Sequence, residues 1–166
     1  MRALTTLALL AGTLTAGLMA GLFAGFAYAV MPGLRRGDDR TFVTAMRRIN
    51  EAILNGWFLG CFMGAPVVIA LAVALQWAGD GGAALPFTVA GLVLYLVMFA
   101  VTAAVNVPLN ERLAAAGEPD GAAGLAAVRE RFESSWVAWN TVRAVAATAA
   151  FGCLAWALVL YGRATA

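Results

Sequence analysis

The chain has 166 residues, of which 63% are hydrophobic and only 12% charged, and its mean hydropathy is +0.84. This composition excludes an ordinary soluble domain, and the length suits one membrane domain over residues 1–166. The formal net charge of +2 is too small to indicate a nucleic-acid partner.

Charged residues are distributed very unevenly along the chain. They are absent from four stretches, residues 3–34, 52–79, 81–110 and 144–162. A helix that spans a membrane needs about 20 mostly apolar residues, and continuous apolar runs do not fit a barrel. We therefore predict an all-α integral membrane four-helix bundle, with additional amphipathic and extended cytoplasmic helical segments. The spans are expected at about 3–31, 57–78, 86–108 and 137–161.

The first apolar stretch resembles a signal peptide, because Met1-Arg2 precedes it and Ala27-Tyr28-Ala29 has small residues at cleavage-site spacing. It is longer than the 7–15 residues of a signal core, so we interpret it as a retained helix. Met31-Pro32-Gly33 is expected to end this helix, since proline disfavours its continuation.

Small residues follow one face of this helix. Gly17, Gly21 and Gly25 are four residues apart, which lets a neighbouring helix approach closely. The pattern favours packing within the chain over a homo-oligomer formed through the same face.

Arginine sets the predicted orientation. The loop between the first two spans holds five arginines, the segment between the last two holds three, and Arg143 stands at the entrance of the last span, so nine of the 11 basic residues lie on one side. The positive-inside rule then places both loops in the cytoplasm and both termini outside. Because arginine replaces lysine throughout and alanine is abundant, we expect a bacterial protein of the inner (cytoplasmic) membrane, in contact with the lipid bilayer.

An amphipathic helix is predicted at about residues 38–55, with its N-cap at Asp38 or Asp39. It is expected to lie against the bundle or the membrane surface and to run without a strong break into the second span. Residues 111–124 are expected to form a polar stretch that serves as a linker. A helix is expected to begin near residue 121, within the end of this stretch, and to continue into the last span.

Several kinds of chemistry are excluded by composition. The chain has no histidine, so it has no serine–histidine–aspartate triad and no histidine-ligated metal or haem. Cys61 and Cys153 lie in apolar runs without a paired motif and are interpreted as small hydrophobic residues. We predict no metal site and no cofactor.

Polar residues collect at the ends of three predicted helices on the cytoplasmic side. They are Asn50, Asn55, Asn106, Asn110, Trp136, Trp139, Asn140 and Arg143. On a helix, the last four share one face. The tryptophans could be an aromatic belt, the asparagines interhelical contacts and the arginine a topology anchor; Asn55 fits the second of these best. Taken together, however, they predict a donor-rich pocket with indole walls.

Four motifs resemble the anthrone oxygenase family along nearly the whole chain. They are Tyr28-x-x-Met31-Pro32-Gly33-Leu34, Met46-x-x-Ile49-Asn50 with Asn55, NVPLN at residues 106–110, and W-x-x-W-N-x-x-R at residues 136–143. Gly56 departs from the pattern, because relatives tend to have proline there. The resemblance implies a small four-helix membrane protein, and the best-known members of the family oxidise anthrones to anthraquinones with no metal or flavin requirement established.

The residues fit such a reaction on a small lipophilic molecule. Arg143 would stabilise the substrate oxyanion, to which Asn106, Asn110 and Asn140 would donate hydrogen bonds. Trp136 and Trp139 would stack on the rings, and Asn50 and Tyr28 are further candidates for contact with the substrate. The base is left open among Glu51, Glu111 and, less favoured, Tyr28. The alternatives are a non-catalytic protein that binds a lipid or quinone, and a packing subunit of a larger assembly.

Overall fold

The computed structural model describes residues 1–79, 81–117 and 121–165. The described residues form helices and turns, with no β-strand among them. The helices are α1 (Arg2–Gly25), the π-helical turn η1 (Phe26–Val30), α2 (Met31–Arg35), α3 (Asp39–Ala52), α4 (Gly56–Ala78), the short 3₁₀ turn η2 (Gly82–Ala84), α5 (Leu85–Val101), the π-helical turn η3 (Thr102–Asn106), α6 (Val107–Ala115) and α7 (Gly121–Thr165).

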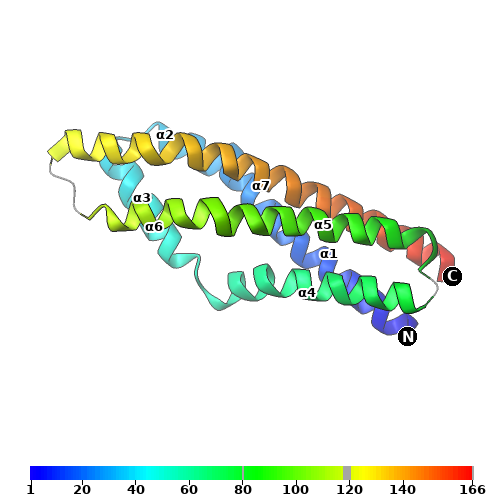
Figure 1. The fold of residues 1–166 in the computed structure, drawn as a ribbon. Coiled ribbons are helices and arrows are strands. Elements are labelled where there is room, and N and C mark those ends of the chain that lie inside the picture. Colours follow the sequence, from blue (N-terminus) through cyan, green and yellow to red (C-terminus); the bar gives the residue numbers. More distant parts are fainter. Residues whose placement is uncertain (80, 118–120, 166) are drawn as a thin grey trace.

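Four continuous helical segments are long and apolar enough to cross a membrane. They cover Arg2–Arg35, Gly56–Ala78, Gly82–Ala115 and Gly121–Ala164. The predicted all-α membrane bundle of four helices is therefore confirmed. Both chain ends lie at one end of the bundle with the turn between α4 and α5, and the arginine-rich segments lie at the other end (Figure 1).

Alanine fills the centre of the bundle, where α7 packs against α1 and α5, and α1 also packs against α4. Ala16, Ala65, Ala147 and Ala150 are completely buried there, beside larger side chains such as Tyr95. Small side chains let apolar helices approach closely, which drives helix association when lipid surrounds the protein.

The glycines of α1 fall into two groups. A Cβ atom on Gly12 would lie 2.9 Å from Ile69 of α4, and one on Gly17 would lie 3.0 Å from Phe151 of α7. Packing within the chain therefore accounts for Gly12 and Gly17. Gly21 and Gly25 have no such neighbour within 4 Å, so their part in an oligomer stays a prediction.

The first helix does not end at Met31-Pro32-Gly33, contrary to expectation. It passes through η1 and continues as α2 to Arg35. Proline lacks an N–H group and clashes with the preceding turn of an α-helix. The wider π turn just before Pro32 accommodates this residue without breaking the helix. The same arrangement recurs where η3 precedes Pro108 and the third segment continues to Ala115.

The amphipathic segment is a separate helix rather than the start of the second span. Helix α3 begins at the N-cap Asp38, whose side chain accepts a hydrogen bond from the Thr41 amide. It ends at Ala52, and Asn55 then caps α4 by accepting from the amides of Trp57 and Phe58. The expected unbroken run is wrong. Asn55 Nδ2 also donates to the Ala52 carbonyl at 2.9 Å, so this side chain both caps α4 and connects it to the end of α3.

Helix α3 packs against the extensions of the bundle at the end opposite the two chain termini. Its apolar face is buried with side chains of α2, α6 and α7 in a second core, which contains Met31, Phe42, Val43, Met46, Leu113, Leu125, Phe132 and Trp136. This core depends on α6 being helical. The expectation of a polar linker was therefore wrong for residues 111–115, whereas α7 begins at Gly121 as expected. The middle of that linker, residues 118–120, lies outside the described residues.

Candidate functional site

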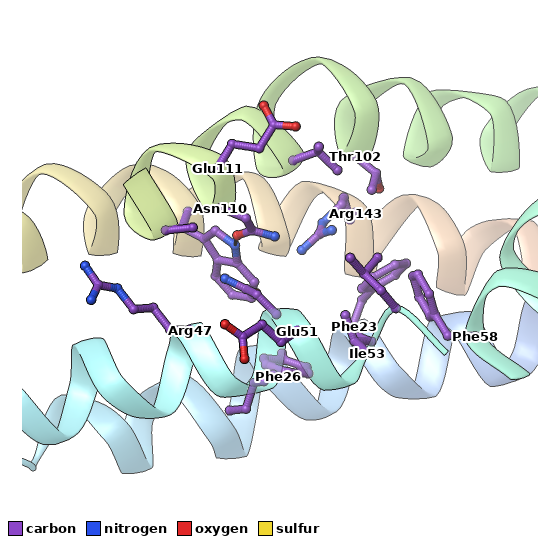
Figure 2. Close-up of a pocket in the computed structure, with 16 residues that line it drawn as sticks. Phe23, Phe26, Arg47, Glu51, Ile53, Phe58, Thr102, Asn110, Glu111 and Arg143 are labelled. Carbon is purple, nitrogen blue, oxygen red and sulfur yellow. Dashed lines mark hydrogen bonds between the residues drawn. The ribbon is translucent and has the colours of Figure 1, made fainter. Parts of the chain in front are cut away.

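A cavity of about 440 Å³ lies between α3 and the bundle, at the level of the two π turns. Its size falls within the roughly 300–1,000 Å³ typical of small-molecule sites. The lining comes from every transmembrane segment and from α3, and Figure 2 shows it in close-up. It comprises Phe23, Phe26, Arg47, Ile49, Asn50, Glu51, Ile53, Leu54, Phe58, Thr102, Val107, Asn110, Glu111, Ala114, Trp136 and Arg143.

Arg143 provides a buried positive charge in this lining. The residue is only 5% exposed, and its guanidinium carbon lies 4.4 Å from the ring centroid of Phe23 and 5.3 Å from that of Trp136. It forms no ion pair with any carboxylate in the described part of the chain. A guanidinium has five N–H donors, and the buried Nε of Arg143 has no hydrogen-bond partner. The site therefore presents an uncompensated cation between two aromatic faces.

Asn140 fixes the direction of that guanidinium. Its side-chain oxygen accepts a hydrogen bond of 2.9 Å from Arg143 Nη2, and its Nδ2 donates to the Phe23 carbonyl at 3.1 Å. Asn140 is 1% exposed and lies behind the cavity lining rather than in it. Its amide therefore positions Arg143 and ties α7 to α1.

The indole wall is held by two asparagines of the NVPLN segment. Trp136 Nε1 donates a hydrogen bond of 2.8 Å to Asn110 Oδ1. Asn106 is completely buried, and its Nδ2 donates to the Trp136 carbonyl at 3.4 Å while its Oδ1 has no partner. The ring of Phe26 lies 5.6 Å from that of Trp136 at an angle of 55°. The π turns η1 and η3 therefore place Phe26 against the indole of Trp136 and Asn106 against its backbone carbonyl.

The α3 wall adds a second cation and one carboxylate, and α6 adds another carboxylate. Arg47 Nε donates to the Leu113 carbonyl at 3.0 Å, while its buried Nη2 has no partner. Glu51 and Glu111 also line the cavity, and both are exposed. Figure 2 shows these two carboxylates on opposite sides of the cavity, on α3 and α6.

The structure brings together part of the predicted set. Asn50, Asn110, Trp136 and Arg143 line one cavity, as do both leading candidates for the base. Asn106 and Asn140 lie immediately behind the lining, in contact with Trp136 and Arg143 respectively.

Two predicted residues lie elsewhere. Tyr28 is 75% exposed on η1, and Trp139 is 41% exposed on α7; neither lines the cavity. Trp136, Asn140 and Arg143 follow each other by four and three residues and stay on the buried face of α7. Trp139 was wrongly grouped with that face, because successive helical residues turn by about 100° and place it at the edge.

Arg47, Thr102 and the phenylalanines Phe23, Phe26 and Phe58 also line the cavity and were not predicted. Arg47 precedes Asn50 by three residues on a helix, which was a usable signal for a shared face. The phenylalanines carried no signal, because they stand in apolar runs like any other membrane residue.

The described residues contain no group of three or more histidine, cysteine, aspartate or glutamate side chains that could hold a metal ion. Cys61 and Cys153 are both free thiols.

Comparison with known proteins gives one match. The family model described as anthrone oxygenase matches residues 57–153, which is more than half of the chain. No curated protein and no solved structure matches significantly. The matched range contains Asn106, Asn110, Trp136 and Arg143, while the α3 wall lies outside it. The chain belongs to the anthrone oxygenase family.

Proposed function

We propose that this protein is a membrane-embedded oxygenase that oxidises a lipophilic phenolic or polycyclic substrate through its enolate, without a cofactor. The observation that carries the proposal is the unpaired Arg143 guanidinium in an aromatic-lined cavity. A buried cation is costly unless an anion compensates it. An enolate oxygen supplied by the substrate provides that anion.

The cavity fits a flat aromatic molecule. Trp136 lines the cavity and is held by the hydrogen bond to Asn110, so the indole keeps one orientation. Aromatic rings associate by offset stacking and edge contacts. The substrate therefore stacks on Trp136 with its oxygen directed to Arg143.

Molecular oxygen is the only oxidant that the proposed reaction requires. A base removes a proton from the doubly benzylic carbon of the anthrone, and the resulting enolate transfers one electron to O₂. The carbon radical and superoxide combine to form a carbon–oxygen bond, and the peroxide anion takes up a proton. Loss of the second proton from the same carbon cleaves the O–O bond and releases water. The products are one anthraquinone and one water for each O₂ consumed.

Arg143 stabilises the charge that develops in the first step. Preorganised donors directed at a developing oxyanion typically change rates by about 10²–10³-fold. Asn140 keeps the guanidinium in place before the substrate arrives. Glu51 and Glu111 are the proposed candidates for the base, because their carboxylates lie at the same cavity.

Oxygen uptake tests this function. The purified protein, in detergent with a metal chelator, is given an anthrone, and O₂ consumption and anthraquinone are measured together. We expect one anthraquinone per O₂, a loss of about 100-fold or more in Arg143→Ala, and a smaller loss in Asn140→Ala. Arg163→Ala removes a charge outside the cavity and serves as the control.

Equal uptake by the wild type and Arg143→Ala, both folded, would contradict the proposal. Tight anthrone binding without turnover in the wild type would favour the alternative, a non-catalytic protein that binds a small apolar ligand.

A further inference from the structure

The α3 wall of the cavity holds two polar groups that the oxygenation chemistry does not use. Arg47 Nη2 and Asn50 Nδ2 are both buried donors without a hydrogen-bond partner. The two residues are three apart on α3, so they share one face of the helix, and both line the cavity. Two unpartnered donors on one wall indicate a ligand that accepts from both.

The Arg47 guanidinium also lacks an ion-pair partner in the described part of the chain. Arg47 forms no ion pair with a carboxylate of the described residues, although Glu51 lies one helical turn further along α3. The hydrogen bond to the Leu113 carbonyl holds the Arg47 side chain through Nε and leaves Nη2 free. Nε therefore holds the guanidinium in place, and Nη2 is available to donate to a ligand.

Arg47 on α3 and Arg143 on α7 lie apart from each other along the cavity lining. Figure 2 shows Asn110 between the two guanidinium groups. Trp136 lies with Asn110, because its Nε1 donates to the Asn110 side chain. A flat ring system stacked on Trp136 can therefore present one edge to Arg143 and another to Arg47.

We propose that the natural substrate is an anthrone-like polycyclic molecule with a carboxylate on the ring remote from the reacting carbonyl, held by Arg47 and Asn50. This inference rests on the proposed function for the position of the reacting edge at Arg143. A carboxylate has two oxygens, which match one guanidinium N–H and one amide N–H. Its charge compensates the second cation, which a neutral hydroxyl group does not.

Two inert probes test this inference without turnover. Binding of anthraquinone-2-carboxylate and of anthraquinone-2-carboxamide is measured by tryptophan fluorescence quenching in nanodiscs of neutral lipid. The probes match in size and differ in charge. Wild-type protein is expected to bind the carboxylate about tenfold more tightly than the amide, because one charge-assisted hydrogen bond contributes a difference in affinity of about this size.

Variants of Arg47 and Arg48 test whether Arg47 is responsible for the preference for the carboxylate. Arg47→Gln is expected to lose the tenfold preference and to bind the carboxamide within about twofold of the wild type, whereas Arg47→Lys keeps part of the preference because the charge remains. Arg48→Gln is the matched control, since this exposed neighbour carries the same charge outside the cavity. Melting temperatures check that each variant is folded.

Three results would overturn the inference: no preference in the wild type, a preference unchanged in folded Arg47→Gln, or an equal loss in Arg48→Gln. The proposed function fails separately, because it is measured as Arg143-dependent oxygen uptake with an anthrone that carries no carboxylate.

Discussion

Some buried polar atoms around the cavity have a hydrogen-bond partner and others have none. Those without a partner are informative. Arg143, Arg47 and Asn50 keep free donors, while Asn140 and Asn110 are engaged with the groups they position. Buried polar groups are normally paired, because an unpaired donor costs about 1–3 kcal/mol. The free donors therefore mark the places where a ligand makes contact.

Trp136 is predicted to determine substrate affinity through its orientation. Trp136→Phe keeps an aromatic ring but removes the hydrogen bond to Asn110, so we expect KM for an anthrone to rise about 3–10-fold. Steady-state oxygen uptake measures the change. Trp139→Phe is the matched control, since this half-exposed indole lies outside the cavity. An equal rise in both variants would show that the hydrogen bond has no such role.

Single residues were predictable where a polar group interrupts an apolar run. Asn106, Asn110, Asn140 and Arg143 stand out for that reason, and all four lie in or directly behind the cavity lining. The exposed position of Trp139 was not predictable, because periodicity alone does not say where the edge of a buried helix face lies.

At the scale of elements, the position of α3 decides whether the cavity exists. A cluster of charged groups holds the start of this helix against α7. Arg129 donates to Glu133 at 2.7 Å, to Asp39 at 3.0 Å, and to the carbonyls of Gly37 and Arg35 at 3.0 and 2.9 Å. Its guanidinium also lies 4.6 Å from the ring centroid of Phe42.

Arg129→Gln is predicted to destabilise the α3 docking by about 2–4 kcal/mol, because several charge-assisted hydrogen bonds are lost together. The expected result is a lower melting temperature in detergent and faster amide exchange across α3. Arg131→Gln, two residues along α7 and exposed, is the control for the loss of charge. Unchanged exchange in Arg129→Gln would mean that apolar packing alone holds α3.

The N-cap of α3 predicts a dependence on pH. The Thr41 amide donates a hydrogen bond of 2.7 Å to Asp38 and thereby lowers the pKa of that carboxyl below its ordinary value. A carboxyl whose pKa is lower when folded stabilises the fold above its unfolded pKa, near 4, and loses this effect as pH falls through the folded pKa.

We therefore expect the protection factor of the Thr41 amide, corrected for intrinsic exchange, to fall as pH is lowered below about 4. Asp38→Asn keeps a capping oxygen that does not titrate, so its protection should stay constant over the same range. A parallel fall in both proteins would assign the effect to another group.

The elements were predictable in kind but not at their ends. Apolar length and the lack of charge were sufficient for the four spans, because a membrane helix needs little else. The helical continuations past Pro32 and Pro108 were not predictable, because the π turns that absorb each proline depend on packing and leave no pattern in the sequence. The break before Asn55 was missed because asparagine serves equally as a cap and as an interhelical donor.

At the scale of the whole molecule, the arrangement separates an apolar half from a polar half. The chain ends and the α4–α5 turn lie at one end, and α3, α6 and the arginine-rich segments lie at the other (Figure 1). The cavity lies toward the second end, where lipid-soluble molecules can meet charged groups. Arginine asymmetry leads us to propose that this end faces the cytoplasm.

Reporter fusions test that orientation in a bacterial host. An alkaline phosphatase fused to the C-terminus is expected to be active, and a green fluorescent protein at the same position is expected to be dark. Each reporter is also fused to a two-span truncation ending after residue 79, and this reference fusion is expected to give the same pattern as the full chain. A fluorescent C-terminal fusion without phosphatase activity would reverse the proposed orientation.

The central claim is that Arg143 stabilises the enolate of the bound substrate, and an anaerobic titration measures this directly. An anthrone is bound to the purified protein without oxygen, and its ionisation is followed by absorbance as pH is raised, in the wild type and in Arg143→Met. Melting temperature and saturation binding establish that both proteins are folded and loaded. A cation next to an ionising oxygen lowers its pKa by about 1–3, so we predict that bound anthrone ionises at a lower pH in the wild type by that amount. The same ionisation pH in both proteins would contradict the account.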